Sequence, residues 1–373
     1  MKIAVDAMGG DRAPAAVVEG ALLAASELGV EVLLVGEQEA VQGALASCPL
    51  NSSSVEIVPA SQNVAMDESP SAALRKKDSS MKVAFELMKQ GAVQAVVSAG
   101  NSGAMMATGM FVMGNLPQVE RPAILVVVPT LGKGTVIIDA GANVDCKPRH
   151  LLQFGLMGSI YAERVLGISQ PRVGVLSNGE EEGKGNDLTR AASEQLSSTG
   201  LNYIGYVEGR DICDGEVDVV VCDGFTGNVT LKTMEGVAGF IVGVLKDAFR
   251  QSLMSRLGYL LSRKSLLKAY NRLDHAEYGG APLLGLDGVA IIAHGGSSPK
   301  AIKNAIRVAK ETVSHDVNRH IIEVLGELSE LGGEKGDKFP RRIWQRIKSK
   351  IEGFGEKSES EGQGRENKSG GKG

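Results

Sequence analysis

The chain has 373 residues, of which 43% are apolar, and a formal net charge of -4, values that are typical of a folded globular protein. Only 4% of the residues are aromatic, which argues against modules that bind nucleic acids by stacking bases on aromatic rings. The cysteines show no zinc spacing, no signal peptide opens the chain, and no apolar run approaches the ~20 residues of a spanning helix. We therefore expect a cytoplasmic protein without a nucleic-acid partner.

Short apolar runs, each ending in a polar turn, recur along the chain and predict strands. They are Ile3 to Val5, Val32 to Val35, Val55 to Val58, Val93 to Val97, Ile124 to Val128, Val136 to Ile138, Arg172 to Leu176, Val217 to Cys222 and Val289 to Ala293. Helical patterns separate most of them; one is expected from Ser71 to Gln90, and Asp11 or a neighbour is expected to cap the first helix. Continuous apolar strands separated by helices predict an α/β fold with a mostly parallel sheet covered on both faces.

The composition divides the chain into three parts. Residues 1–333 are expected to form one catalytic α/β domain, with a basic amphipathic helical excursion at about residues 245–278. A basic C-terminal helix is predicted over residues 334–352. Residues 353–373 are rich in Glu, Lys, Ser and Gly, which predicts a disordered tail.

The loops that follow the predicted strands are rich in Gly, Asn, Ser and Asp. Ligands bind open α/β sheets at the carboxyl ends of the strands, so we expect these loops to face each other across one crevice. Free N–H groups and helix dipoles there favour an anion. The candidate binding residues are Asp6, Gly9, Gly10, Asp11, Ser98, Gly100, Asn101, Ser102, Gly103, Gly141, Asn143, Asn178, Asp223, Gly224, Thr226 and Gly227.

Several other ligands and chemistries are disfavoured. No GxGxxG follows a strand, and the stretch from Gly179 to Gly185 is one residue short of a P-loop and lacks its final Ser or Thr, which argues against a nucleotide. No GxSxG elbow surrounds Ser98 or Ser102, so a covalent serine mechanism is not expected. The strand-end aspartates form no compact carboxylate motif, and we expect neither a metal nor a cofactor.

Three residues are candidates for catalysis, each with a plainer alternative. Lys184 either reaches a phosphate or oxyanion or is a solvated loop lysine. Asn228 either donates a hydrogen bond into the crevice or caps the helix that follows. His294 either acts on a substrate or is a structural histidine.

A basic, leucine-rich stretch runs from Leu245 to Arg272. Such a helical segment can lie on an anionic membrane or dock an acidic partner. The alternative is a helical pair whose leucines face the core or a subunit interface. The candidate docking residues are Arg256, Leu257, Leu260, Leu261, Arg263, Lys264, Leu267 and Lys268.

Six of these stretches closely resemble the bacterial phosphate acyltransferases of phospholipid synthesis, in the expected order over residues 1 to about 330. They are Asp6 to Asp11, Ser98 to Ala104, Asp139 to Asn143, Ser177 to Asn186, Asp223 to Asn228, and His294 with Gly295. The resemblance implies transfer of a long acyl chain from acyl carrier protein to inorganic phosphate. It also implies a fold similar to phosphotransacetylases and the isocitrate dehydrogenase group, a homodimer and peripheral attachment to the membrane. The downstream glycerol-3-phosphate acyltransferase is a further candidate partner.

In this mechanism, we expect N–H groups of residues 98–103 and 141–143 to hold phosphate. Lys184 offsets its charge, Asn228 donates to the developing oxyanion, and His294 orients a substrate. Two rival functions stay open. One is a phosphate acetyl- or butyryltransferase that uses coenzyme A, and the other is a noncatalytic membrane scaffold that binds phosphate or lipid.

Overall fold

The computed structural model describes residues 1–50, 54–130, 132, 134–181, 183–273 and 279–332, so the predicted terminal helix and tail lie outside the described residues. The strands are β1 (Lys2–Asp6), β2 (Glu31–Gly36), β3 (Val55–Pro59), β4 (Ala95–Ser98), β5 (Ala123–Val128), β6 (Thr135–Ile138), β7 (Val173–Leu176), β8 (Tyr203–Val207), β9 (Val219–Val221), β10 (Ala281–Leu284) and β11 (Val289–Ile292). The helices are α1 (Ala15–Leu28), α2 (Gln38–Ser47), α3 (Pro70–Ala73), α4 (Ser80–Lys89), α5 (Ser102–Val112), α6 (Pro148–Arg164), α7 (Asp187–Ser197), α8 (Gly224–Arg250), α9 (Leu253–Leu273), α11 (Pro299–Ser314) and α12 (Val317–Gly332).

All these strands join one sheet in the order β3-β2-β1-β4-β11-β10-β5-β6-β9-β7-β8. Seven of the ten pairings are parallel, which confirms the predicted mostly parallel sheet. The antiparallel pairings are β11-β10, β10-β5 and β5-β6, at the centre of the sheet. They reverse the strand direction, so β6, β9 and β7 run antiparallel to β1, β4 and β11.

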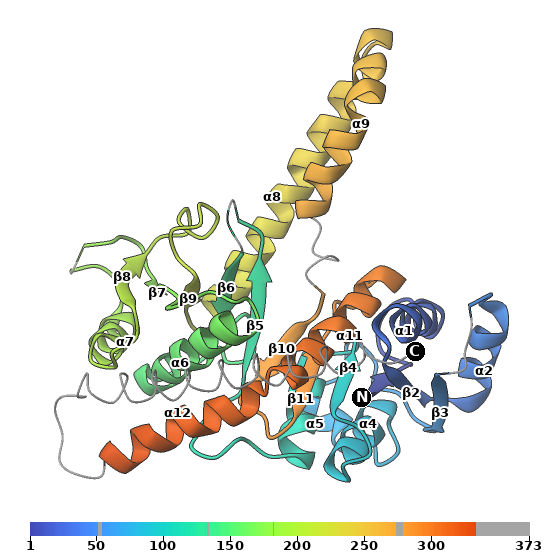
Figure 1. The fold of residues 1–373 in the computed structure, drawn as a ribbon, viewed down its shortest axis with the longest axis horizontal. Coiled ribbons are helices and arrows are strands. Elements are labelled where there is room, and N and C mark those ends of the chain that lie inside the picture. Colours follow the sequence, from blue (N-terminus) through green and yellow to red (C-terminus); the bar gives the residue numbers. More distant parts are fainter. Residues whose placement is uncertain (51–53, 131, 133, 182, 274–278, 333–373) are drawn as a thin grey trace, which may run out of the picture.

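Helices cover both faces, as the continuous apolar strands predict (Figure 1). In β1, Ile3 and Val5 belong to a hydrophobic cluster with α1 and α11, whereas Ala4 belongs to one with α4 and α5. In the other half of the sheet, α6, α7 and α12 share a cluster with β5, β6, β7 and β9. Leu231 and Met234 from the first half of α8 pack against the opposite face. Each strand therefore needs apolar side chains at consecutive positions.

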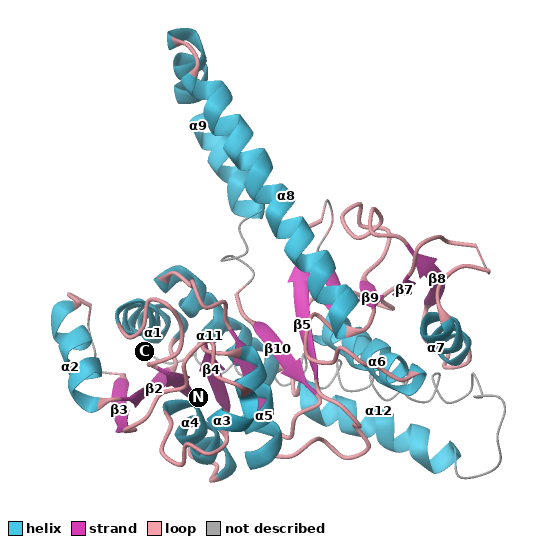
Figure 2. Ribbon diagram, turned by 180° about the vertical axis from the view of Figure 1, so that it is seen from behind, coloured by secondary structure: helices cyan, strands magenta, loops and turns pink. Residues whose placement is uncertain are grey.

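Helices α8 and α9 run side by side and project far beyond the sheet (Figures 1 and 2). Among the described helices, α8 is long and apolar enough to cross a membrane by length and composition alone, which is weak evidence of a span. The sequence did not predict a helix of this kind, because its apolar residues do not form an unbroken run of that length. Most of its large apolar residues are exposed, and only Leu231 and Met234 near its start pack against the sheet, so the leucine-rich stretch belongs to a helical hairpin and not to a core helix.

Two local predictions are wrong. The helix expected from Ser71 to Gln90 is two helices, α3 and α4, because the Ser79 hydroxyl accepts a hydrogen bond from Lys82 N at 3.3 Å and starts a new helix there. Asp11 does not cap the first helix, since α1 begins after Pro14 with no side-chain cap.

Candidate active site

The carboxyl ends of β1 and β4 meet at the point where the strand order reverses, because β2 and β3 lie on one side of β1 and β4 lies on the other. Such a switch point is where open α/β sheets bind ligands. Asp6 and Ser98 are direct partners in the strand register. The Ser98 hydroxyl donates to Asp6 Oδ2 at 2.7 Å, and Met8 N donates to Asp6 Oδ1 at 3.2 Å. Both side chains are buried, and we call this pair the floor of the first group of site residues.

Asp6 is held by the protein itself. Burial raises the pKa of Asp6, and hydrogen bonds from Ser80, Ser98, Met8 and Gly9 oppose that shift. Gly9 passes so close that a Cβ there would lie 2.7 Å from Gly100 N and 2.8 Å from Asp6 Oδ2. The Asp6 to Gly10 stretch is therefore a tightly packed turn, and Asp6 is a buried structural carboxylate with no face left for a substrate anion.

Helix α5 begins directly after this floor. Asn101 is its N-cap, and Asn101 Oδ1 accepts from Ala104 N at 2.9 Å. The next two N–H groups, of Ser102 and Gly103, have no hydrogen-bond partner among the described residues. Two free N–H groups at the positive end of an 11-residue helix can bind an anion.

The turn after β11 completes the first group of site residues. Asp11 N donates to Gly295 O at 2.8 Å, and His294 Nδ1 accepts from Gly296 N at 3.1 Å. The neutral His294 ring therefore carries its proton on Nε2, and the side chain is exposed. A Cβ at Gly10 would lie 2.8 Å from Gly295 O, which places the first turn against this one.

In the second group of site residues, Asp139 occupies the centre of the turn after β6. Its carboxylate accepts from the N–H groups of Ile124, Gly141, Ala142 and Asn143 and from Asn143 Nδ2, at 2.6 to 3.1 Å. Burial raises the pKa of Asp139, and these hydrogen bonds oppose the shift. The turn therefore binds its own anion, which leaves the N–H groups of Gly141 and Asn143 engaged. The expectation that they hold phosphate is wrong for this structure.

The start of α8 is also filled. Asp223 is the N-cap, and its carboxylate accepts from Thr226 N and Thr226 Oγ1, each at 2.8 Å. Gly224 N donates to Asn143 O at 2.7 Å. Gly227 packs on the backbone of Asp139, where a Cβ would clash with the carbonyl oxygen. This helix start does not offer the empty anion site expected for it.

Asn228 is thus not the cap of α8. It lies in the second turn of the helix and is exposed, and its side-chain amide has no hydrogen-bond partner among the described residues. A Cβ built on Gly141 would be 3.6 Å from Asn228 Cβ, so the side chain lies over the Asp139 turn. Its amide is free to donate to a substrate.

The loop after β7 lies beside this turn, because β7 pairs with β9. Asn178 Oδ1 accepts from Gly185 N at 2.9 Å, which folds the loop back on itself. Asn178 is therefore a loop-shaping residue. Lys184 is exposed, and its Nζ is 3.9 Å from Glu181 Oε2, a loose ion pair that leaves the ammonium group accessible.

The predicted site residues therefore form two groups, one at the carboxyl ends of β1, β4 and β11 and the other at the carboxyl ends of β6, β7 and β9. That the two groups face one crevice stays a prediction. The first group contains Asp6, Asp11, Ser98, Asn101 and His294, and the second contains Asn143, Asn178, Lys184, Asp223 and Asn228. Ala140, which follows Asp139, belongs to the same buried hydrophobic cluster as Ala104 and Met105 of α5. Within the described part of the chain, no three His, Cys, Asp or Glu residues are placed to hold a metal ion.

The candidate docking residues lie on α9, away from both groups. Exposed fractions are 52% for Leu257, 65% for Leu260, 81% for Leu261 and 45% for Leu267, which excludes the reading that these leucines face the core. The basic residues interleaved with them are exposed as well: Arg256, Arg263, Lys264 and Lys268.

Solved structures define the class of this fold. The chain superposes on a phosphotransacetylase from Streptococcus pyogenes with a TM-score of 0.56 and 17% identity, covering 84% of this chain and 94% of that one. A EutD phosphotransacetylase from Staphylococcus aureus gives a TM-score of 0.52 and 15% identity, covering 85% and 94%. The predicted phosphotransacetylase-like fold is confirmed.

Sequence relatives narrow the class. A family model described as "Fatty acid synthesis protein" matches residues 1–320, and the chain belongs to this family. It is 56% identical over 328 residues to the phosphate acyltransferase of Geotalea uraniireducens, covering 88% of this chain and 95% of the relative. It is 53% identical over 324 residues to that of Geobacter sulfurreducens, covering 87% and 94%. The chain is accordingly an acyltransferase of lipid synthesis, as the resemblance of its motifs implied.

Proposed function

We propose that this chain transfers a long-chain fatty acyl group from acyl carrier protein to inorganic phosphate and releases acyl phosphate for phospholipid synthesis. The observation that carries the proposal is the start of α5, where the N–H groups of Ser102 and Gly103 are unpartnered at the switch point of the sheet. The names of the relatives support phosphate as the acceptor.

The reaction does not need a strong general acid or base. A phosphate oxygen attacks the thioester carbonyl carbon, a C–O bond forms, the C–S bond breaks, and the thiolate takes a proton from water. Phosphate is already an anionic nucleophile, and the leaving thiol has an ordinary pKa of about 8.5, so positioning and charge stabilisation suffice. In this proposal the N–H groups of Ser102 and Gly103 hold phosphate against the α5 dipole.

The second group supplies the charge stabilisation. The free amide of Asn228 donates to the carbonyl oxygen as it becomes an oxyanion, a contribution of about 3 kcal/mol in comparable sites. Lys184 offsets the phosphate charge, and Nε2–H of His294 orients a substrate oxygen.

The α8–α9 hairpin is the proposed contact with the membrane. Its tip exposes Leu253 by 83% and Met254 by 77%, next to Arg250 and Arg256. Apolar side chains ringed by cations are typical of surfaces that insert into the headgroup region of anionic lipid. Peripheral attachment would place the enzyme next to a membrane-bound glycerol-3-phosphate acyltransferase, the proposed user of acyl phosphate.

The proposed oligomer is a homodimer. Helix α8 exposes Val237, Phe240, Ile241 and Val244, with Phe240 exposed by 71%, and nothing lies within 4 Å of a Cβ built on Gly236, Gly239 or Gly243. A face with large apolar and small residues suits close packing against a second copy of the helix. The proposed subunit interface therefore lies on the exposed face of α8, and the proposed lipid contact lies at the tip of the hairpin.

Two assays test the function. The pure protein is incubated with phosphate and either palmitoyl carrier protein or acetyl coenzyme A, and acyl phosphate is trapped with hydroxylamine. We expect product from the carrier-linked long chain. Product from acetyl coenzyme A alone would establish the short-chain rival, and no product from either donor would favour a noncatalytic scaffold.

A further inference from the structure

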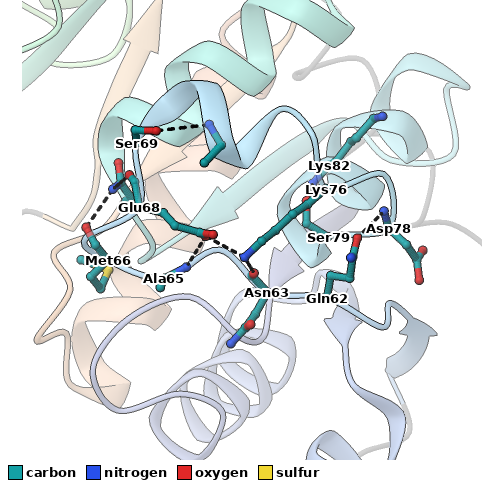
Figure 3. Close-up of polar contacts among 12 residues, drawn as sticks. Gln62, Asn63, Ala65, Met66, Glu68, Ser69, Lys76, Asp78, Ser79 and Lys82 are labelled. Carbon is teal, nitrogen blue, oxygen red and sulfur yellow. Dashed lines mark hydrogen bonds and ion pairs between the residues drawn. The ribbon is translucent and has the colours of Figure 1, made fainter.

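Residues 62–79, here called the strap, form a loop that is bonded to itself (Figure 3). Its ends are joined because Gln62 N donates to Asp78 O at 3.0 Å and Ser80 N donates to Gln62 O at 2.9 Å. The Ser61 hydroxyl adds a hydrogen bond of 2.6 Å to Asp78 Oδ2. The strap therefore leaves the body and returns to it at one place.

Inside the strap, Glu68 and Lys76 form a staple. Glu68 Oε2 accepts from Lys76 Nζ at 2.7 Å and from Ala65 N at 3.0 Å, and Lys76 Nζ also donates to Asn63 O at 2.7 Å. These bonds cross the loop, as Figure 3 shows. The neighbours Arg75 and Lys77 are exposed. The staple links parts of the strap to each other, while Val64 and Ala73 anchor the strap in the hydrophobic core.

One side chain fastens the strap to α5. Asn101 Nδ2 donates to Met66 O at 2.8 Å and to Glu68 O at 2.9 Å, while Asn101 Oδ1 caps the helix. The same part of the strap touches both neighbouring turns. A Cβ on Gly103 would lie 3.2 Å from Pro70 Cγ, and one on Gly295 would lie 2.7 Å from Met66 Cε. The strap thus lies over the free N–H groups of α5.

Asn101 has no donor left for a ligand, because both hydrogens of its amide are used by the strap. We propose that Asn101 is a positioning residue that latches the strap over the phosphate-binding end of α5, so that an ordered strap is required for tight phosphate binding. This inference rests on the proposed function. It replaces the sequence-based assignment of the Asn101 side chain as a phosphate ligand.

The replacement Asn101→Ser separates the latch from the cap. Serine is a good N-cap, carries no charge, and lacks both amide donors. We expect the KM for inorganic phosphate to rise about tenfold, which corresponds to about 1.4 kcal/mol, with kcat changed by less than about twofold. The melting temperature should stay close to that of the wild type.

Tryptic cleavage measures how accessible the strap is, because Arg75 and Lys77 lie on it and are exposed. Cleavage after these residues should be faster in Asn101→Ser than in the wild type. Inorganic phosphate should slow the cleavage of the wild type and have little effect on the variant. A residue with only a structural role would not change this response to phosphate.

A second variant opens the strap without touching α5. Glu68→Ala removes the staple, and we expect the same rise in phosphate KM and the same faster cleavage. Glu86→Ala is the matched control: it removes a partly exposed carboxylate 3.8 Å from Lys82 Nζ on α4, outside the strap, and should leave both readouts unchanged.

Equal tryptic rates in wild type and Asn101→Ser would overturn the latch. Faster cleavage with an unchanged phosphate KM would overturn its role in the reaction. A wild-type protein that makes no acyl phosphate would overturn the proposed function instead, and cleavage with and without phosphate would still decide whether Asn101 couples the strap to phosphate binding.

Discussion

Asp139 and Asn143 are joined twice: Asp139 Oδ2 accepts from the backbone N–H of Asn143 at 2.6 Å and from its side-chain amide at 2.9 Å. With three further N–H donors on Oδ1, the carboxylate has only donors around it. The turn after β6 is therefore an anion site that the chain fills itself. By contrast, the start of α5 keeps its free N–H groups for a ligand.

The Asp139 turn should be sensitive to loss of one acceptor. In Asp139→Asn, an NH2 group replaces an oxygen and faces N–H donors, which leaves buried donors unpaired. We expect the free energy of unfolding to fall by about 2–4 kcal/mol, measured by denaturant titration. The control Asp145→Asn changes an exposed carboxylate two residues beyond Asn143 and should cost less than about 0.5 kcal/mol. Equal stability of both variants would contradict this account of the turn.

The buried carboxyl of Asp6 should make stability depend on pH. Burial raises the pKa of Asp6 above its ordinary value of 3.8. Above that pH the unfolded carboxyl ionises before the native one, so the native state binds more protons and the free energy of unfolding falls as the pH rises. The fall ends once the native carboxyl is ionised.

Asp6→Asn lacks this titration. The wild-type value minus the variant value should therefore decrease with rising pH, from about pH 4 upward. Guanidinium titrations of both proteins at a series of pH values measure the difference. A difference that is constant or increases with pH would be inconsistent with a raised pKa.

Asn228 and Lys184 are exposed, so their loss should affect catalysis more than folding. We expect Asn228→Ala to lower kcat by about a hundredfold and Lys184→Ala by at least tenfold, with melting temperatures unchanged. Lys232→Ala, one turn beyond Asn228 on α8 and paired with Glu235 at 2.8 Å, is the control and should retain wild-type kcat. Unchanged turnover in both test variants would remove these residues from the mechanism.

The hairpin prediction concerns membrane binding. Replacing Leu257, Leu260 and Leu261 with Glu should release the protein from anionic vesicles, measured by cosedimentation. The anionic lipid would repel the three added carboxylates, and inserting them among the lipids would be costly. Phe111→Glu, which changes a side chain exposed by 67% on α5, is a surface control and should still bind. Retention of the triple variant at wild-type levels would assign this stretch to packing or dimerisation, and light scattering would then show a change in mass.

Much of the fold follows from local pattern. Apolar runs such as Val32 to Val35 correspond to buried strands, because a sheet covered on both faces needs apolar residues at every position. Strand β8 was missed because Gly205 interrupts a short and partly exposed run, and β10 because it begins with Ala-Pro. The reversal of strand direction depends on the missed β10, so the sequence pattern could not predict that β6, β7 and β9 run antiparallel to β1 and β4.

The site was predicted at the level of loops but not of single atoms. Glycine-rich turns correctly indicate helix starts that attract negative charge. Whether that charge is a ligand or the chain's own carboxylate depends on where Asp139 and Asp223 point. Asn101 and Asn228 show the same limit, since one amide is consumed by the strap and the other is free, although both follow strands of similar pattern.

The most direct test of the central claim is to follow oxygen-18 from fully labelled inorganic phosphate during turnover with palmitoyl carrier protein. Attack of a phosphate oxygen on the thioester carbonyl predicts acyl phosphate that retains all the phosphate label, with one labelled oxygen bridging carbon and phosphorus. Mass spectrometry of the product reads this pattern. Release of free palmitate without labelled acyl phosphate would contradict the proposed transfer.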